Sequence, residues 1–422
     1  MNEIEITAAK VREGARWLAR ASTRAKNDAL THMAAALRER SREILAANAV
    51  DVKNSERDTA FVDRLKLTPD RVEAMAAAIE EVRLLEDPIG RVDRMVRRPN
   101  GLQVGRQRIP LGVVGIIYEA RPNVTSDAAA LCLKSGNGVL LRGGSDAFAS
   151  NQAIYDALRL GLTKSSLDPR AHDAVGFINS PDRDAVGEML KLDTYIDVII
   201  PRGGKSLIRY VNEHSRIPVI KHDEGVCHVV VEGTANADMV DDIVINSKTH
   251  RPTVCNSAET LLVLKNAVDG HLARVMSKLA EAGVHMYLDE TAHGVAVASN
   301  LPTACYARAT EEHYFQEFLS LEIAIGVVDD LEAAIAHIGK YGSRHTEALV
   351  TNDHALAQAF IDAVDSSCVV INASTRFADG NQLGLGAEIG ISTTRLHAYG
   401  PMGIEELTTT KFIVLGDGQV RN

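Results

Sequence analysis

Residues 112–144, GVVGIIYEARPNVTSDAAALCLKSGNGVLLRGG, begin and end with short apolar runs at 112–118 and 138–143. Apolar runs of this length, bounded by glycine, are typical of strands that are buried on both faces. Patterns typical of helices follow at 145–162 and 180–192 and alternate with further apolar runs. This alternation predicts a largely parallel, doubly wound α/β sheet. The other runs of this first set are 174–178, 197–201 and 228–232.

A second set of apolar runs lies further along the chain and again alternates with helical patterns, such as those at 267–283 and 330–342. Because 422 residues are too many for one hydrophobic core, we interpret the two sets as two α/β domains in tandem. The runs of the second set are 260–264, 284–289, 322–328, 347–351 and 368–373.

The first hundred residues repeat alanine, leucine, isoleucine and valine at helical spacing, with charged residues between them. We expect amphipathic helices there, with their charged faces in solvent. Proline and glycine punctuate the stretch from 95 to 111, which predicts a β-hairpin. The expected domains are 1–225, which includes the helices and the hairpin, then 226–395, and then a C-terminal segment, 396–422.

The composition excludes several classes of protein. With 45% hydrophobic and 24% charged residues, the chain is typical of a soluble globular protein. Its net charge of −10 argues against a nucleic acid or an anionic membrane as the main partner. No run approaches the ~20 apolar residues of a membrane span, and the acidic N-terminal stretch lacks the apolar segment of a secretory signal. We therefore expect a cytoplasmic protein that binds neither nucleic acid nor membranes.

The five cysteines are widely spaced, so we expect neither a disulfide framework nor a zinc site. The nearest approach to a set of metal ligands is His222, Cys227 and His228. Cys227 and His228 are neighbours in an expected strand, so their side chains point to opposite faces. No metal is therefore expected.

Cys255 lies in the stretch RPTVCNS at 251–257, and Lys248 and Arg251 are close to it in sequence. A nearby positive charge lowers the pKa of a thiol and makes the thiolate available for attack on an acyl carbon. On these residues alone, a core or incidental cysteine is as plausible as a nucleophile. Asn123, which follows the first strand, can either donate its side-chain N–H to a developing oxyanion or simply occupy a turn.

Two glycine turns connect strands to helices at places where dinucleotide-binding folds present backbone N–H groups to phosphates. The chain has no GxGxxG after its first strand, and GLGAEIG at 384–390 has the wrong spacing. Each turn alone can be a plain structural turn, but two of the same form favour an anionic cofactor. Ser145 is placed to cap the helix that follows it. The first turn contains Arg142, Gly143, Gly144 and Ser145, and the second contains Arg202, Gly203, Gly204, Lys205 and Ser206.

The order of these features is similar to that of a known family. Residues 109–147 resemble the cofactor-domain segment of the aldehyde dehydrogenase superfamily, and residues 251–263 resemble its nucleophile segment. Residues 328–351, with SRHTE at 343–347, resemble the signature of the gamma-glutamyl phosphate reductases within that superfamily. The resemblance covers nearly the whole chain. It implies an aldehyde-dehydrogenase-like fold with an NADP-binding domain, a catalytic domain and a small β oligomerisation element built from the hairpin and the C-terminal segment.

The resemblance also implies an activity, namely the NADPH-dependent reduction of L-glutamyl 5-phosphate to L-glutamate 5-semialdehyde with release of phosphate. This is the second step of proline biosynthesis. It further implies a homo-oligomer, either a dimer or a tetramer, and functional coupling to glutamate 5-kinase. Another semialdehyde dehydrogenase or an acylating aldehyde dehydrogenase is the alternative within the same fold.

The resemblance assigns roles to single positions. Cys255 matches the nucleophile, and Asn123 with the backbone N–H of Cys255 matches the oxyanion hole. Arg142 stands where the superfamily usually has a lysine near the adenosine ribose, and an arginine there suits a 2′-phosphate. The second glycine turn, with Gly203, Gly204 and Ser206, matches the part that holds the pyrophosphate. Glu317 resembles the glutamate that hydrogen-bonds the nicotinamide ribose.

One departure from the family pattern concerns water activation. When the chain is aligned on Gly225, the position of the glutamate that activates water in hydrolytic members falls on His222, with Asp223 and Glu224 out of register. Reduction of an acyl phosphate needs no activated water, so the absence agrees with the implied activity. An anionic substrate on an acidic protein needs specific cations. The candidates for binding its carboxylate or phosphate are Arg121, Lys248, Arg251, His345 and Arg376.

Overall fold

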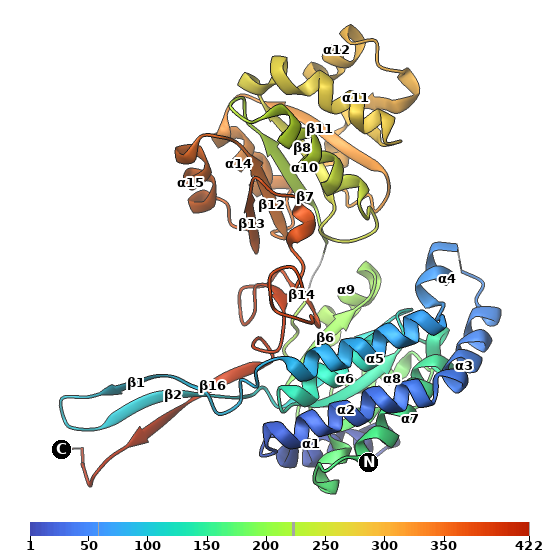
Figure 1. Ribbon diagram of the computed structural model, residues 1–422, viewed down its shortest axis with the longest axis vertical. Helices are drawn as coiled ribbons and strands as arrows, with labels where there is room; N and C mark the ends of the chain where they lie inside the picture. Colours follow the sequence, from blue (N-terminus) through green and yellow to red (C-terminus); the bar gives the residue numbers. More distant parts are fainter. Residues whose placement is uncertain (58, 222–223, 422) are drawn as a thin grey trace. The chain divides into compact units, whose positions relative to one another are not determined.

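The chain folds as two units, each built around a parallel sheet (Figure 1). The structure is a computed structural model that describes all residues except 58, 222, 223 and 422. The first unit comprises Met1–Lys221 and Gly384–Asn422, and the second comprises His222–Leu383. The second unit is thus inserted between two parts of the first. The boundaries expected from the sequence are 225 and 395; the assignment of the cofactor and the catalytic role to these domains stays a prediction.

The sheet of the first unit has four parallel strands in the order β5-β4-β3-β6. Every residue of its central strands β3 and β4 is buried, which explains the unbroken apolar runs in the sequence. The strands are β3 (Val113–Tyr118), β4 (Gly138–Gly143), β5 (Val175–Phe177) and β6 (Val198–Arg202).

Helices cover both faces of this sheet, so the doubly wound fold is confirmed. Alternate residues of β3 belong to different apolar clusters. Val113 and Ile117 lie in the cluster on one face of the sheet, and Val114 and Ile116 lie in the cluster on the other face. The helices of the first face are α1 (Glu3–Leu18), α8 (Asp184–Met189) and α9 (Lys205–His214). The helices on the other side are α2 (Thr23–Glu39), α3 (Ser41–Asn54), α5 (Pro69–Leu84), α6 (Asn123–Lys134) and α7 (Phe148–Lys164). The short α4 (Thr59–Leu65) follows α3.

An antiparallel three-stranded sheet extends from the first unit as an arm (Figure 1). Strands β1 (Val92–Arg97) and β2 (Gln103–Pro110) form the expected hairpin, and β16 (Thr408–Leu415) pairs with β2 along its whole length. The arm exposes apolar side chains, including Phe412 at 65% of its surface and Val414 at 55%. The same unit contains the short pair β14 (Gly390–Ser392) and β15 (Gly400–Met402).

The second unit has a sheet of seven parallel strands in the order β10-β9-β11-β8-β7-β12-β13. Helices again pack on both faces, because neighbouring residues of β8 such as Leu261 and Leu262 lie in different apolar clusters. The strands are β7 (Cys227–Val231), β8 (Ala258–Leu264), β9 (His285–Leu288), β10 (Tyr306–Arg308), β11 (Glu322–Val328), β12 (Thr346–Val350) and β13 (Cys368–Ile371). The helices are α10 (Ala237–Thr249), α11 (Ala273–Glu281), α12 (Glu290–Ala298), α13 (Glu311–Tyr314), α14 (Leu331–Tyr341) and α15 (His354–Ala363). Across the described part of the chain, no helix combines the length and the apolar character that crossing a bilayer requires.

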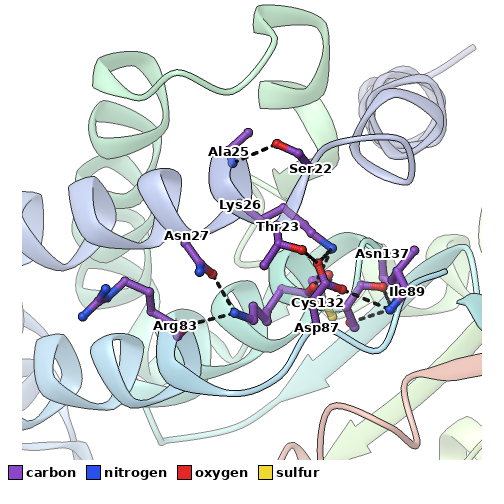
Figure 2. Close-up of polar contacts among 12 residues, drawn as sticks. Ser22, Thr23, Ala25, Lys26, Asn27, Arg83, Asp87, Ile89, Cys132 and Asn137 are labelled. Atoms are coloured by element: carbon purple, nitrogen blue, oxygen red, sulfur yellow. Dashed lines mark hydrogen bonds and ion pairs between the residues drawn. The ribbon is translucent and has the colours of Figure 1, made fainter. Parts of the chain in front are cut away.

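A buried polar cluster joins α2, the end of α5 and the end of α6 in the first unit (Figure 2). The ammonium group of Lys26 lies 2.5 Å from the carboxylate of Asp87, and both side chains are largely buried. Asp87 also accepts hydrogen bonds from Thr23 and from the backbone N–H of Ile89. Lys134, which is fully buried, donates to the side chain of Asn27 and to the backbone carbonyl of Arg83. Lys26 therefore pairs directly with Asp87, and Lys134 is attracted by the same carboxylate from a longer distance.

The substitution Asp87→Asn should destabilise the first unit by about 3–5 kcal/mol, because it leaves the buried ammonium group of Lys26 without its carboxylate and removes the attraction on Lys134. Lys26→Met should cost less, since Asp87 keeps its two other hydrogen bonds and the attraction of Lys134. The fluorescence of Trp17, the chain's single tryptophan, reports urea unfolding of this unit. Asp193→Asn at an exposed position is the control. A smaller loss for Asp87→Asn than for Lys26→Met would contradict the interpretation.

Candidate active site

The first unit places the two expected cofactor turns at the carboxyl ends of β4 and β6, and the loop to Asn123 at the carboxyl end of β3, which lies next to β6. Strand order reverses between these neighbouring strands, and α/β folds bind ligands in the crevice outside such a switch point. The chain leaves β3 at Glu119, whose backbone N–H donates to the carbonyl of Arg202 at the end of β6. The turn with Gly203 and Gly204 and the loop that leads to Asn123 therefore begin side by side.

A carboxylate of the chain itself lies at the N-terminus of α9. The carboxylate of Glu119 accepts the backbone N–H of Gly204, the residue before the helix, at 2.8 Å. A Cβ atom on Gly203 would lie 2.6 Å from that carboxylate, so a larger residue there would displace the side chain of Glu119. The turn thus has the character of an anion site. A cofactor phosphate at Gly203, Gly204 and Ser206 would take the place of Glu119.

The first glycine turn differs from the expectation at Ser145. Ser145 begins a short 3-10 helix, Ser145–Ala147, and it is not the N-cap of α7. The carboxylate of Asp51, from α3, instead accepts the backbone N–H groups of Ala149 and Ser150 at 3.2 and 2.7 Å. The prediction of Ser145 as a helix cap is therefore wrong, because a side chain distant in sequence satisfies the orphan N–H groups of this helix.

Gly143 and Gly144 are both close to neighbouring groups. A Cβ on Gly143 would lie 2.1 Å from the side-chain nitrogen of Asn151, so the glycine lets the end of β4 pack against α7. A Cβ on Gly144 would lie 3.4 Å from the backbone of Glu119. The packing explains Gly143 without a cofactor, and the part of both glycines in cofactor binding stays a prediction.

Arg142 is buried at the end of β4, with 5% of its surface exposed. Its guanidinium donates to the backbone carbonyl of Asp182 at 2.7 Å. Burial lowers the pKa of Arg142, and so does the positive charge of the neighbouring Arg183. Arg183 is exposed at the start of α8. Sequence reasoning missed Arg183, because an arginine in a charged helical stretch carries no local signal.

Asn123 is the first residue of α6 and is exposed. Its side-chain nitrogen donates to a carboxylate oxygen of Asp127, one turn further along, at 2.8 Å. An amide nitrogen carries two hydrogens, so this bond fixes which end of the amide is the donor and leaves the second N–H for a ligand. Burial raises the pKa of Asp127 to about 6, against the hydrogen bonds from Asn123 and Ser126 and the charge of Arg202. Sequence reasoning missed Asp127.

The second unit places Cys255 at the amino edge of its sheet, in the loop between α10 and β8. Hydrogen bonds hold this loop at the two residues that follow the cysteine. Asn256 accepts from the hydroxyl of Thr375 at 2.7 Å through its carbonyl, and its side chain donates to the carbonyl of Ala378 at 3.0 Å. Ser257 is buried and donates to the end of α10. Cys255 itself is partly exposed.

A buried ion pair brackets Cys255 in the sequence. The ammonium group of Lys248 lies 2.6 Å from the carboxylate of Glu259, and neither side chain is exposed. Burial raises the pKa of Glu259 and lowers that of Lys248. The backbone of Leu319 lowers the pKa of Glu259, so the pair lies next to the loop before β11. Lys248 thus lies inside the unit, and its part in substrate binding stays a prediction.

Gly225 is in direct contact with the nucleophile loop. A Cβ on Gly225 would lie 2.0 Å from the carbonyl oxygen of Cys255, so the contact requires glycine. The backbone N–H of Gly225 donates to the carboxylate of Glu317 at 3.0 Å, and the thiol of Cys227 donates to the carbonyl of Cys255 at 3.2 Å. Glu317 therefore lies at the same edge of the sheet as Cys255. The expected position of the water-activating group, His222, and its neighbour Asp223 are outside the described residues.

The SRHTE segment is part of the scaffold beneath this edge. His345 is buried, and its Nδ1 lies 2.8 Å from the hydroxyl of Thr346 and 3.7 Å from the sulfur of Cys227. Glu347 forms a fully buried pair with His228 at 2.8 Å. Arg344 has a φ of +61°, a conformation that costs free energy for residues other than glycine. These contacts favour a holding role for His345, and its contact with substrate stays a prediction.

Two cationic side chains lie near Cys255. Arg376 is partly buried, and its Nε donates to His250 at 3.3 Å. Its pKa is lowered by burial and also responds to the charges of Cys255 and Arg251. The structure therefore brings together Cys255, Arg251 and Arg376, which suit an anionic acyl substrate. Arg121 is exposed in the first unit.

The comparisons with known proteins agree with this arrangement. The family model described as "Aldehyde dehydrogenase family" matches residues 2–303. The gamma-glutamyl phosphate reductase of Geotalea daltonii is 52% identical over 422 residues, which cover 99% of each chain. The crystal structure of gamma-glutamyl phosphate reductase from Thermotoga maritima has a TM-score of 0.95 and 42% identity, with 100% of each chain covered.

A more distant structure shares the fold alone. The acetylating aldehyde dehydrogenase of Geobacillus thermoglucosidasius has a TM-score of 0.71 and 16% identity, covering 100% of this chain and 98% of its own. The family match covers more than half of the chain, and the identity to full-length relatives extends over nearly all of it. The chain therefore belongs to the aldehyde dehydrogenase family, within the group whose members are named gamma-glutamyl phosphate reductase.

Proposed function

We propose that this oxidoreductase reduces L-glutamyl 5-phosphate to L-glutamate 5-semialdehyde and releases phosphate, using NADPH, as the second step of proline biosynthesis. The observation that carries the proposal is the placement of Cys255. It is partly exposed in a loop held by hydrogen bonds at Asn256, with Arg251 four residues earlier in the chain and Arg376 close enough for its pKa to respond to the charge of the cysteine. A thiolate near cations matches attack on an acyl phosphate. The names of the full-length relatives supply the substrate.

The proposed chemistry has two stages on Cys255. The thiolate attacks the acyl carbon, the bond to the phosphate oxygen breaks, and phosphate leaves with that bond's electron pair to give a thioester. The second N–H of Asn123 and the backbone N–H of Cys255 stabilise the oxyanion. NADPH, when bound, supplies a hydride. Addition of the hydride to the thioester carbon leaves a thiohemiacetal oxyanion on Cys255. Its electron pair re-forms the carbonyl as the C–S bond breaks, which releases the aldehyde and the Cys255 thiolate.

The residues proposed for NADPH are those at the switch point of the first unit. Gly203, Gly204 and Ser206 are proposed for the pyrophosphate, because the turn already holds the carboxylate of Glu119 as an anion. Arg142 and the exposed Arg183 are close to each other and are proposed for the 2′-phosphate. Glu317 is proposed for the nicotinamide ribose.

The remaining proposals concern partners. Arg251 and Arg376 are the leading cations for the substrate, with Arg121, Lys248 and His345 as further candidates. The arm exposes apolar strand residues, and we propose that it makes the protein a homo-oligomer. Coupling to glutamate 5-kinase and a cytoplasmic location also belong to this proposal.

The central test is the reverse reaction, the oxidation of glutamate semialdehyde. Wild type should reduce NADP only when phosphate is present and should do so more efficiently than NAD. Cys255→Ala should lower kcat/KM by at least about 1,000-fold, because it removes the thiol that forms the thioester. Full activity in Cys255→Ser would contradict the mechanism. Turnover with coenzyme A in place of phosphate would favour the acylating alternative.

A second prediction concerns the contact of Gly225 with the nucleophile loop. Gly225→Ala must displace the carbonyl of Cys255, and a shift of about 1 Å at a reacting group can cost about 100-fold in rate. We expect kcat to fall 10- to 100-fold, on that same principle, with the fold retained by circular dichroism. Gly294→Ala in α12 is the matched control, since no neighbouring atom approaches its Cβ position. Equal activity in both variants would contradict the argument.

A third prediction is a pH dependence that comes from Asp127. With its pKa raised to about 6, Asp127 becomes protonated below that pH and holds the amide of Asn123 less firmly. We expect kcat/KM to fall as the pH decreases through about 6, and this limb to disappear in Asp127→Asn. Because the folded pKa is raised, the contribution of Asp127 to stability is present below the unfolded pKa and is lost as the pH rises through about 6.

The control for this prediction is Asp156→Asn in α7. Gln152 and Asp156 form the same amide-to-carboxylate pair, one helical turn apart, at 2.9 Å. The pH profile should therefore keep its acidic limb in Asp156→Asn. Thermal unfolding at pH 4 and pH 7 measures the opposite trend in stability. An unchanged limb in Asp127→Asn would exclude Asp127 as its source.

A further inference from the structure

We propose that a cavity in the first unit, between α1 and the base of the β1-β2-β16 arm, binds a small polyanion. The ligand class is a metabolite with two or more negative charges on phosphate or carboxylate groups. The cavity has a volume of about 630 Å³, within the range of small-molecule sites. This inference does not depend on the proposed function.

The cavity is lined by cations. Among the described residues no aspartate or glutamate lines it, although acidic residues outnumber basic ones in the chain, 56 to 46. Arginine side chains bind phosphate and carboxylate through paired hydrogen bonds, and lysine adds a point charge. The cationic lining residues are Arg12, Arg16, Arg20, Arg108 and Lys411.

Part of this charge is balanced by acids outside the lining. Arg12 pairs with Asp197 at 3.0 Å, and Arg108 and Arg91 share the carboxylates of Asp93 and Glu405. Arg16 pairs with Glu13, but both side chains are more than half exposed, so that pair is weak. Six cations therefore face four carboxylates, which leaves two positive charges.

Arg20 and Lys411 carry the unbalanced charge. The guanidinium of Arg20 lies 5.9 Å from the centre of the Trp17 ring, and among the described residues neither Arg20 nor Lys411 forms an ion pair with a carboxylate. Arg20 follows the end of α1, and Lys411 lies on β16. An anion between them would connect the helix to the arm.

The buried cluster of Figure 2 lies behind one wall of the cavity. The carboxylate of Asp87 accepts the backbone N–H of Ile89, and Ile89 and Gly90 line the cavity. Lys26 pairs with that carboxylate, and the second ammonium group, of Lys134, interacts with it from a longer distance. The cluster therefore fixes the wall and adds a positive potential to it.

The cavity is distinct from the proposed cofactor site. Its residues Gly112 and Gly136 precede β3 and β4, whereas the cofactor turns follow β4 and β6. A strand of six residues spans about 20 Å, so the two sites lie at opposite edges of the same sheet. Ala15, Ile89, Ile109 and Pro110 give the cavity an apolar wall for the carbon skeleton of a ligand.

The test is calorimetric titration of the full chain with pyrophosphate, citrate and acetate at constant ionic strength. Saturating NADP keeps the probes out of the proposed cofactor site. We expect pyrophosphate or citrate to bind at least about 10-fold more tightly than acetate, a difference of about 1.4 kcal/mol. Tighter binding of pyrophosphate points to a phosphate ester, and tighter binding of citrate points to a polycarboxylate.

The double variant Arg20→Ala, Lys411→Ala should weaken the binding of the preferred probe at least about 10-fold, because it removes the unbalanced charge. Lys10→Ala is the control, as Lys10 is exposed on α1 but does not line the cavity. Unchanged binding in the double variant, or an equal loss in Lys10→Ala, would overturn the proposal. If the wild-type protein binds none of the probes at millimolar concentration, the proposal is overturned as well. Light scattering on the double variant gives a further test. A change of oligomeric state in that variant would overturn the proposal, because a second copy of the chain would then cover the cavity.

Discussion

Helices on both faces of a parallel sheet leave only its two edges for polar chemistry, and this constraint organises both units. Strands such as β3, β4 and β8 are fully buried, so charged and reactive groups lie where strands begin or end. The first unit uses its carboxyl edge, where Asn123 and the turn at Gly203 follow β3 and β6. The second unit places Cys255 at the opposite, amino edge of its sheet. The general rule that α/β folds bind ligands at the carboxyl ends of their strands therefore predicts the location of the first site but not that of the second.

Buried groups around the proposed reactive residues fix the positions of those residues. The Lys248–Glu259 pair has no exposed surface, and it joins α10 and β8 around Cys255, next to the loop before β11. Removing one member would leave an isolated buried charge, so the pair acts as a single structural unit. Gly225 fits the same loop by having no side chain. In the first unit, Asp127 holds the side chain of Asn123 in a similar way, by accepting a hydrogen bond from its amide.

The sequence predicted the fold well because buried strands carry an unbroken apolar signal. All ten apolar runs that follow the hairpin correspond to strands of the two parallel sheets. Contacts between residues that are far apart in the sequence leave no comparable pattern in it. Asp51 satisfies the start of α7 from 98 and 99 positions away, so the local pattern at Ser145 was misleading. The burial of Lys248 also depends on a partner, Glu259, that sequence spacing alone does not identify.

The pairing of β16 with β2 has a consequence for how the chain is made. Residues 408–415 form the edge of a sheet whose other strands lie in residues 92–110, so the arm cannot be completed until almost the whole chain has left the ribosome. The second unit, with Cys255, is synthesised entirely within that interval. Until then β2 has an unpaired edge, which is open to wrong partners. The nascent protein thus passes through a period in which its inserted unit can fold while its first unit still awaits a strand.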